Sequence, residues 1–236
     1  MEEVYIIIPA RIGSTRLPNK PLIDLNGRSL IQRVYLNASK ISSKVFVATD
    51  SKKIEQNLSE YTSNIIMTSS DHISGTDRIY EAAKKLNIKD DSLIINLQGD
   101  EPFLPIDAVS QIIQTYQSIE PDVITLSCAL NDINDLNNPN CVKVKTNIDN
   151  YALDFFRISD EENLNRHIGI YGYSFKTLKK LINLDPSDRE IEYKLEQLRF
   201  LDNNFSIYVS HYKHAIPHGI DTNMDAIKAR KILTNT

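Results

Sequence analysis

Short apolar runs alternate, along the first half of the chain, with longer stretches in which apolar positions recur every three or four residues. Residues 4–8 are continuously apolar and rich in β-branched side chains, which is typical of a strand covered on both faces. Residues 29–40 carry apolar side chains at helical spacing and predict an amphipathic helix. The same pattern predicts strands at 44–48, 64–67 and 92–97, one helix beginning near residue 50, and another at 76–86.

Strands that alternate with helices in this way predict an α/β fold with a mostly parallel sheet and helices on both faces. Ligands of such sheets bind at the carboxyl ends of the strands. Polar or charged residues follow three of the predicted strands, at 9–11, 48–50 and 98–101. We therefore expect these three segments to lie along one edge of the sheet.

The second half of the chain has a less regular pattern. Strand-like alternation occurs at 142–146, 167–173 and 206–212, residues 187–201 are typical of a helix, and a last helix is expected at 222–233. The asparagine-rich stretch 131–140 is expected to be a surface loop. Because there is no repeat or linker, we expect a single domain, 1–236, in which approximately residues 130–215 form a smaller lobe.

Composition narrows the class of protein. With 41% hydrophobic and 25% charged residues among 236, a sizeable core is expected. A net charge of -4 argues against a nucleic-acid binder. No apolar run is long enough to span a membrane or to form the apolar part of an export signal. Two cysteines without metal-ligand spacing, Cys128 and Cys141, suit a reducing compartment. We expect a cytoplasmic protein without nucleic-acid or membrane partners.

A cationic loop follows the first predicted strand. Arg11, Arg16 and Lys20 lie within ten residues, together with Gly13 and Ser14. Backbone N–H groups of a Gly/Ser loop can form an anion-binding nest, and guanidinium groups can bind phosphate oxygens through two hydrogen bonds. The loop matches neither common phosphate-binding motif, and a solvated basic loop is the alternative. Its place at a strand end favours phosphate binding.

Two aspartates are candidate metal ligands. Asp100 follows an apolar strand, with Gly99 allowing close backbone approach, and Asp221 precedes the last predicted helix. Carboxylates at such positions suit Mg²⁺, which binds one or two of them together with phosphate oxygens and water. The alternative for each aspartate is a helix cap.

These segments carry a family resemblance that extends over nearly the whole chain. The loop PARIGSTRLPNKP at 9–21 resembles the signature of the 3-deoxy-manno-octulosonate cytidylyltransferases, also called CMP-Kdo synthetases. Related segments follow in the same order: ATD at 48–50, SGTDR at 74–78, NLQGDEP at 96–102, RHIGIYGY at 166–173, LEQLR at 195–199 and GIDT at 219–222. Together they are far more specific than any single motif.

The resemblance implies a Rossmann-like nucleotide-diphospho-sugar transferase fold, in which the anomeric hydroxyl of an acidic sugar attacks the α-phosphorus of CTP and pyrophosphate departs. It also implies Mg²⁺ as cofactor, a homodimer formed through the smaller lobe, and a place in the synthesis of lipopolysaccharide or another surface glycan. The implied catalytic residues are Arg11, Lys20, Asp100 and Asp221, of which Asp100 and Asp221 are metal ligands. The implied nucleotide-binding residues are Pro9, Ala10, Arg11, Gly13, Ser14, Arg16, Lys20, Ser74 and Gly75. The implied acceptor-binding residues are Arg78, Gln98, Arg157, His167, Tyr171, Glu196 and Gln197.

The chain departs from the family pattern in the half that handles the acceptor sugar. Asp154-Phe155-Phe156-Arg157 replaces the usual Tyr-Phe-Ser-Arg, the connection 158–165 is shorter than usual, and the usual glutamate near Glu192 is displaced by one position. The acceptor therefore stays open among Kdo, an 8-amino variant and another carboxylated sugar or acid. A glycosyltransferase, a nucleotidyltransferase that uses another base, and a non-catalytic nucleotide-binding protein are the competing interpretations.

Overall fold

A computed structural model describes residues 3–13, 16–130, 133–161 and 163–234 of the chain. It divides into two compact units. The first combines Met1–Ile106 with Pro217–Thr236, and the second is Asp107–Ile216. The second unit thus begins earlier in the sequence than the lobe expected at 130–215. None of the helices in the described ranges has the length and apolar character needed to cross a membrane.

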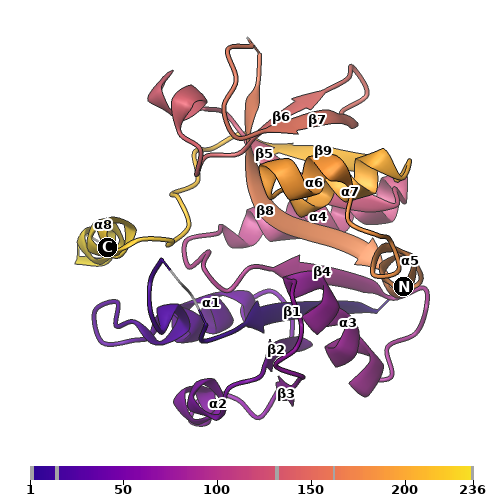
Figure 1. Cartoon of the computed structure of the whole chain (residues 1–236). Helices are drawn as coiled ribbons and strands as arrows, with labels where there is room; N and C mark the ends of the chain where they lie inside the picture. Colours follow the sequence, from indigo (N-terminus) through magenta and orange to yellow (C-terminus); the bar gives the residue numbers. More distant parts are fainter. Residues whose placement is uncertain (1–2, 14–15, 131–132, 162, 235–236) are drawn as a thin grey trace. The chain divides into compact units, whose positions relative to one another are not determined.

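The first unit contains parallel strands in the order β3 (Ile65–Met67), β2 (Val45–Thr49), β1 (Val4–Ala10) and β4 (Leu93–Leu97), drawn in indigo to purple in Figure 1. The carboxyl-terminal half of β1 and all of β4 are buried, as their continuous apolar sequences predicted. From β1 the chain moves outward to β2 and β3 and then returns to β4. The two inner strands therefore flank the point at which the strand order reverses, where α/β sheets bind ligands.

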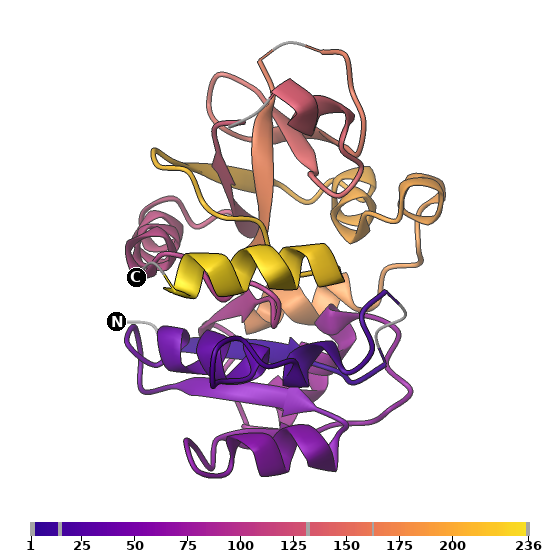
Figure 2. The same ribbon diagram turned by 90° about the vertical axis from the view of Figure 1, so that its left-hand side faces the viewer.

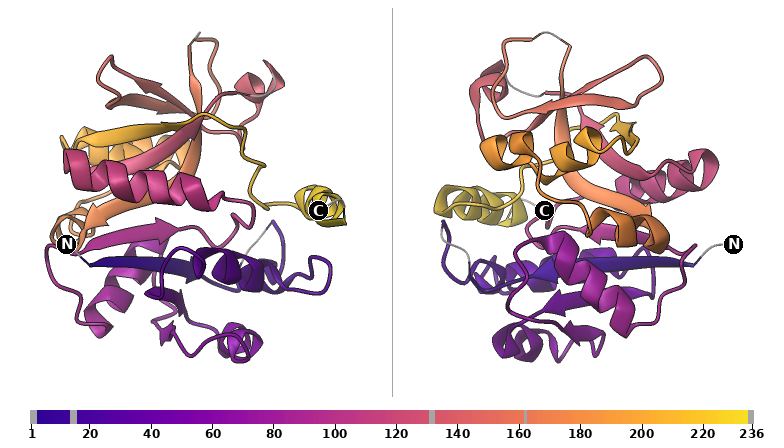
Figure 3. Two further views of the ribbon diagram at one scale, coloured as in Figure 1. Left: turned by 180° about the vertical axis from the view of Figure 1, so that it is seen from behind. Right: turned by 45° about the vertical axis from the view of Figure 1, so that its right-hand side comes forward.

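Helices cover both faces of this sheet. Figure 3 shows α1 (Leu30–Ala38) and α3 (Gly75–Lys85) on opposite sides of it, and α2 (Lys52–Leu58) connects β2 to β3. Capping boxes at Ser29 and Ser74 begin α1 and α3. These elements confirm the α/β fold class, and each expected element of the first hundred residues is present with small shifts of its ends.

The last helix, α8 (Asn223–Thr234), belongs to the first unit although it follows the second in sequence. Arg230 Nε donates to the carbonyl of Asp24 at 3.0 Å, and Asn26 Nδ2 donates to the carbonyl of Arg230 at 2.9 Å. Figure 2 shows α8 beside the chain that follows β1, which includes the short 3-10 helix η1 (Lys20–Leu22). These contacts bring the segment around residue 221 to the first unit.

The second unit has a mixed sheet. In its centre β5 (Val123–Cys128) pairs antiparallel with β8 (Asn165–Ser174) and parallel with β9 (Ile207–Tyr212). Two shorter strands, β6 (Lys143–Thr146) and β7 (Ala152–Phe156), pair antiparallel with each other, and β6 also pairs with β8. The unit also contains α4 (Ile106–Ile119) and α5 (Phe175–Leu181).

Two expectations for this unit are wrong in detail. The single helix expected at 187–201 is two helices, α6 (Asp188–Tyr193) and α7 (Glu196–Asp202). Between them Lys194 has a positive φ of 55°, which ends α6 with a left-handed residue. The asparagine-rich stretch contains a 3-10 helix, η2 (Ile133–Asn137), rather than only an irregular loop. The apolar pattern did not predict α4, β5, β7 or α5.

Candidate active site

A cavity of about 350 Å³ lies in the first unit at the carboxyl ends of β1 and β4. It is built from the strand-end segments 9–10 and 98–100, the loop that follows β1, the start of α3, and the segment before α8. Most of the residues proposed from the sequence for nucleotide, metal and acceptor line it: Pro9, Ala10, Arg11, Gly13, Arg16, Lys20, Ser74, Gly75, Arg78, Gln98, Asp100 and Asp221. Segments more than 200 residues apart therefore meet around one space.

The turn after β4 lies directly against β1 because Gly99 has no side chain. A Cβ atom at Gly99 would lie 2.9 Å from the backbone oxygen of Pro9, closer than real side chains approach. The backbone N–H of Ile220 donates to the carbonyl of Asp100 at 2.9 Å. This hydrogen bond joins the turn after β4 to the segment before α8, so the backbones that carry Asp100 and Asp221 are held together.

Lys20 bridges the two aspartates. Its Nζ lies 2.6 Å from Asp100 Oδ2 and 2.7 Å from Asp221 Oδ1, and its side chain is only 15% exposed. Burial by itself would lower the pKa of Lys20, but the charges and hydrogen bonds of both carboxylates raise it above its usual value. Arg16 Nη2 donates to the same oxygen of Asp221 at 3.2 Å. Two cations and two anions are thereby concentrated at one side of the cavity.

The side chain of Asp221 is directed to these cations and does not cap α8. Thr222 and Asp225 perform that function, since the Thr222 N–H donates to Asp225 Oδ2 at 2.9 Å and the Asp225 N–H donates to Thr222 Oγ1 at 3.3 Å. The helix-cap alternative raised by the sequence therefore fails for Asp221. It also fails for Asp100, because the next helix, α4, begins six residues later.

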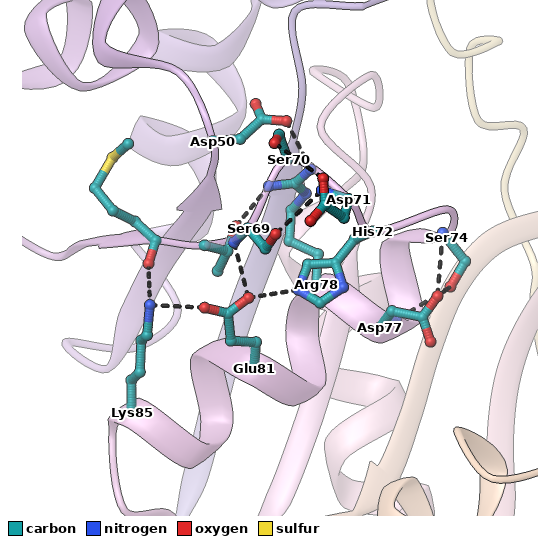
Figure 4. A network of polar contacts seen from close by, with 12 residues as sticks. Asp50, Ser69, Ser70, Asp71, His72, Ser74, Asp77, Arg78, Glu81 and Lys85 are labelled. Carbon is teal, nitrogen blue, oxygen red and sulfur yellow. Dashed lines mark hydrogen bonds and ion pairs between the residues drawn. The ribbon is translucent and has the colours of Figure 1, made fainter.

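Arg78 is held by polar groups from the ends of neighbouring strands. Its Nη2 donates to Asp50 Oδ2 at 2.9 Å, its Nη1 donates to Thr68 Oγ1, and the residue is only 2% exposed (Figure 4). A buried guanidinium with a carboxylate partner keeps its charge and a fixed orientation. Arg78 thus reaches the cavity from α3 as a fixed cation.

The loop between β3 and α3 is tied to α3 by a second polar cluster, also drawn in Figure 4. Glu81 Oε2 contacts His72 Nε2 at 2.5 Å and accepts from the backbone N–H of Ser69 at 2.8 Å, while Lys85 Nζ lies 2.7 Å from Glu81 Oε1. Desolvation by itself would raise the pKa of Glu81, but the hydrogen bonds from Lys85, Ser69 and His72 lower it to about 2. The loop places the carbonyl of Ile73 where it accepts from Arg11 at 3.5 Å.

The five other acceptor residues expected from the sequence belong to the second unit. Arg157 donates to the backbone carbonyls of Pro139, Tyr193 and Lys194, contacts that favour a structural role. On β8, His167 and Tyr171 have ring centroids 5.5 Å apart. At the start of α7, Glu196 pairs with Arg199 at 3.0 Å and Gln197 is 5% exposed.

His167 lies in the core of the second unit. Its Nε2 is 3.0 Å from Thr125 Oγ1, and its ring meets the Phe155 ring edge-on at 5.0 Å between centroids. Burial, and secondarily the charge of Arg166, lower the pKa of His167 from 6.5 to about 3. The imidazole is therefore neutral at physiological pH and takes part in hydrogen bonding without a charge.

We expect His167 to make the protein less stable in mild acid. Below the usual pKa the unfolded chain takes up a proton that the folded protein does not, so the free energy of unfolding falls by up to about 1.4 kcal/mol per pH unit. The stability that the neutral, buried imidazole contributes is fully present above its usual pKa of 6.5. It is lost progressively as the pH falls towards the pKa of about 3 that His167 has in the folded protein. Urea unfolding from about pH 7.5 to about pH 5 measures it. His167→Gln should show a shallower pH dependence than the unmodified protein, and equal slopes would contradict the prediction.

Comparison with known proteins identifies the family. A family model described as cytidylyltransferase matches residues 5–207. This chain belongs to the cytidylyltransferase family. A 3-deoxy-manno-octulosonate cytidylyltransferase of Francisella tularensis subsp. holarctica is 40% identical over 247 residues, covering 98% of this chain and 99% of that protein. A protein of the same name from Histophilus somni is 38% identical, with 98% of each chain covered.

Solved structures agree with this family assignment. CMP:2-keto-3-deoxy-manno-octonic acid synthetase complexed with CTP superimposes with a TM-score of 0.91 and 34% sequence identity, and 99% of each chain is covered. A cytidylyltransferase from Leptospira borgpetersenii serovar Hardjo-bovis has a TM-score of 0.66 at 18% identity, covering 100% of this chain and 88% of that one. The second likeness concerns the fold alone.

The carboxylate oxygens at this site suit a divalent cation as ligands. Two carboxylates from distant segments converge on a single ammonium group, which marks a position where a positive charge is stabilised. Nowhere in the described ranges do three His, Cys, Asp or Glu side chains group as metal ligands. Mg²⁺ does not need such a cage, because one or two carboxylates with water and phosphate oxygens complete its shell.

Three cavity residues were not among the proposed site residues, namely Pro21, Ile73 and Gly99. Gly99 had a recognisable signal, since a glycine between a strand end and an acidic residue permits close backbone approach. Ile73 had none, because an isoleucine that is 87% exposed cannot be distinguished in a sequence from a buried one. Ser14, proposed as a phosphate contact, lies outside the described residues.

Proposed function

We propose that this chain transfers CMP from CTP to the anomeric hydroxyl of an acidic sugar, Kdo or a close variant, and releases pyrophosphate. The observation that carries the proposal is the meeting of Lys20 with Asp100 and Asp221 in the cavity at the ends of β1 and β4. The 40% identity to named 3-deoxy-manno-octulosonate cytidylyltransferases over nearly the full length supports the same assignment.

In the proposed reaction the anomeric hydroxyl loses its proton to water and its oxygen forms a bond to the α-phosphorus, while the bond from that phosphorus to the bridging oxygen of the β-phosphate breaks. Arg11, Arg16 and Lys20 bind the phosphate oxygens and stabilise the departing pyrophosphate. Asp100 and Asp221 hold a divalent cation, which we propose to be Mg²⁺. When bound, the cation supplies charge neutralisation at the α-phosphate and lowers the pKa of the attacking hydroxyl.

For the acceptor we propose Arg78 and Gln98 as contacts from the first unit, where both line the cavity. The fixed guanidinium of Arg78 suits a carboxylate, and the amide of Gln98 suits sugar hydroxyls. By family resemblance, His167, Tyr171, Glu196 and Gln197 also contribute to acceptor recognition. The burial and neutral state of His167 suit a hydrogen-bonding role better than an ionic one. Arg157 would act by holding the backbone near residues 193 and 194.

The test is a pyrophosphate-release assay with a panel of donors and acceptors. CTP, UTP and GTP are each combined with Mg²⁺ and with Kdo, 8-amino-Kdo, another carboxylated sugar, or a neutral sugar phosphate. We expect release with CTP and a carboxylated sugar, and little with UTP, GTP or the neutral sugar phosphate. Efficient reaction with the neutral sugar phosphate would overturn the acceptor proposal. Tight CTP binding without turnover of any acid would favour a non-catalytic protein, and preferential binding of a nucleotide sugar would favour a glycosyltransferase.

We propose that the protein is a cytoplasmic homodimer, associated through the second unit, that serves the synthesis of lipopolysaccharide or another surface glycan. Large apolar side chains exposed on this unit support the dimer: Ile148, Leu153, Ile158, Ile191 and Tyr193. Exposed apolar side chains that lie side by side are typical of an association surface, and the proposal requires that these residues form one. Sedimentation velocity distinguishes a dimer from a monomer, and a monomer at micromolar concentration would contradict this part of the proposal.

A further inference from the structure

The ammonium group of Lys20 lies where a cation bound by Asp100 and Asp221 would lie. Its Nζ is 2.6 Å from one carboxylate and 2.7 Å from the other. The two aspartates come from segments held together by the hydrogen bond between Ile220 and the carbonyl of Asp100. A single charged nitrogen therefore links two carboxylates that are fixed by the backbone.

This arrangement has a direct consequence for metal binding. A divalent ion shared by the two aspartates would approach their oxygens to about 2.0–2.1 Å if it were Mg²⁺. The ammonium occupies the space between the same oxygens, and two cations so close together would repel strongly in a partly desolvated site. The ion and the ammonium cannot both occupy this position, so Lys20 has to move away before both aspartates can bind the ion.

Lys20 has a second set of partners available in the same cavity. It lines the cavity with Arg11 and Arg16, at the end of the cationic loop. In the proposed reaction a triphosphate brings several negative charges next to these side chains. An ammonium that leaves the aspartates can then bind phosphate oxygens, so the ion pair that it loses is replaced and its charge is not left without a partner.

We propose that Lys20 is a tethered counter-ion, which neutralises Asp100 and Asp221 before the nucleotide binds and makes tight metal binding depend on the triphosphate. The nucleotide moves the ammonium to its phosphates and so frees the aspartates for the divalent ion. Because binding couplings are reciprocal, the metal strengthens nucleotide binding by the same factor. The inference rests on the proposed two-aspartate metal site and adds a role for Lys20 that precedes the reaction.

The experiment measures metal binding without nucleotide or acceptor. Mn²⁺ serves as the probe, with free Mn²⁺ quantified by electron paramagnetic resonance in the full-length protein. Lys20→Met removes the ammonium and keeps the length of the side chain, and Lys40→Met, at an exposed position of the same unit, is the matched control. We expect Lys20→Met to bind Mn²⁺ about tenfold more tightly than the unmodified protein, within the usual range of coupling between sites. Lys40→Met should leave the affinity unchanged.

A second variant shows that the gained affinity belongs to this site. Adding Asp100→Asn to Lys20→Met should remove the gain, because one of the two carboxylates is lost. Thermal unfolding with Mn²⁺ gives an independent readout, since an ion that binds only the folded protein raises Tm more when it binds more tightly. Equal Mn²⁺ affinity in Lys20→Met and the unmodified protein, or a gain that survives Asp100→Asn, would overturn the inference. Neither result depends on CTP turnover, so failure here is distinguishable from failure of the proposed function.

Discussion

Replacing Asp100 by asparagine is expected to lower kcat/KM for CTP-dependent pyrophosphate release by about a thousandfold, equivalent to about 4 kcal/mol of transition-state stabilisation. The amide preserves the shape of the side chain but removes one of the two negative charges proposed to hold the divalent ion. It also removes the charge partner of Lys20 at 2.6 Å. Steady-state pyrophosphate release, measured over a range of Mg²⁺ concentrations, tests the expectation.

The effect of this substitution on folding should be small. The side chain of Asp100 is 30% exposed, and a partly exposed ion pair contributes up to about 1 kcal/mol to stability. A large loss of activity with a nearly unchanged Tm therefore separates a role in the reaction from a role in the fold. Asp91→Asn, at an exposed position just before β4, is the matched control and should keep full activity. An Asp100→Asn variant with more than about a tenth of the normal rate would refute the assignment of Asp100 as a metal ligand.

Gly99→Ala is expected to damage both the fold and the site. The added methyl group would lie 2.9 Å from the backbone oxygen of Pro9. Since a backbone carbonyl of a central strand cannot rotate away, β1 and the turn after β4 must separate. Overpacking of this kind costs about 1–3 kcal/mol. The separation also moves Pro9 and Ala10 relative to Asp100, and a displacement of about 1 Å at a reaction site can reduce the rate by about a hundredfold.

Gly75→Ala provides the comparison for stability. A methyl group there would meet the side chain of Pro9 at 3.4 Å, an ordinary van der Waals contact. Gly75 is the first residue of α3, where alanine is well tolerated. Thermal unfolding should therefore show a much larger loss of Tm for Gly99→Ala than for Gly75→Ala. Similar losses of Tm in the two variants would show that the close approach of Gly99 to the backbone oxygen of Pro9 is not what makes Gly99→Ala destabilising.

The first unit was predictable because its signals are local. Continuous apolar strands, amphipathic helices and capping residues each depend on a few neighbouring side chains, and β1, α1, β2, β3, α3 and β4 all lie close to their expected positions. The parallel sheet then follows from the alternation of strands and helices. The same rule predicted that segments 9–11, 48–50 and 98–101 lie along one edge of the sheet.

The second unit was harder to predict for equally physical reasons. The break between α6 and α7 depends on the positive φ of Lys194, a conformation for which lysine has no distinctive sequence signal. Arg157 has the residue type of a ligand-binding group, yet its guanidinium donates to three backbone carbonyls. Which partners a long cationic side chain contacts depends on backbone far away in the sequence.

By itself the sequence predicted the fold class, the cationic loop and Asp100 as a candidate metal ligand, because strand ends and charged residues can be read from short windows. Asp221 became a candidate metal ligand mainly through the family resemblance, since its position before a helix also suits a cap. Tertiary structure alone decided that Lys20 bridges Asp100 and Asp221, and that the side chain of Asp221 is directed to Lys20 and Arg16. It also decided that His167 is neutral in a buried position. These properties arise from contacts between residues up to 205 positions apart, and the energy of such contacts depends on burial and distance, which only the folded chain defines.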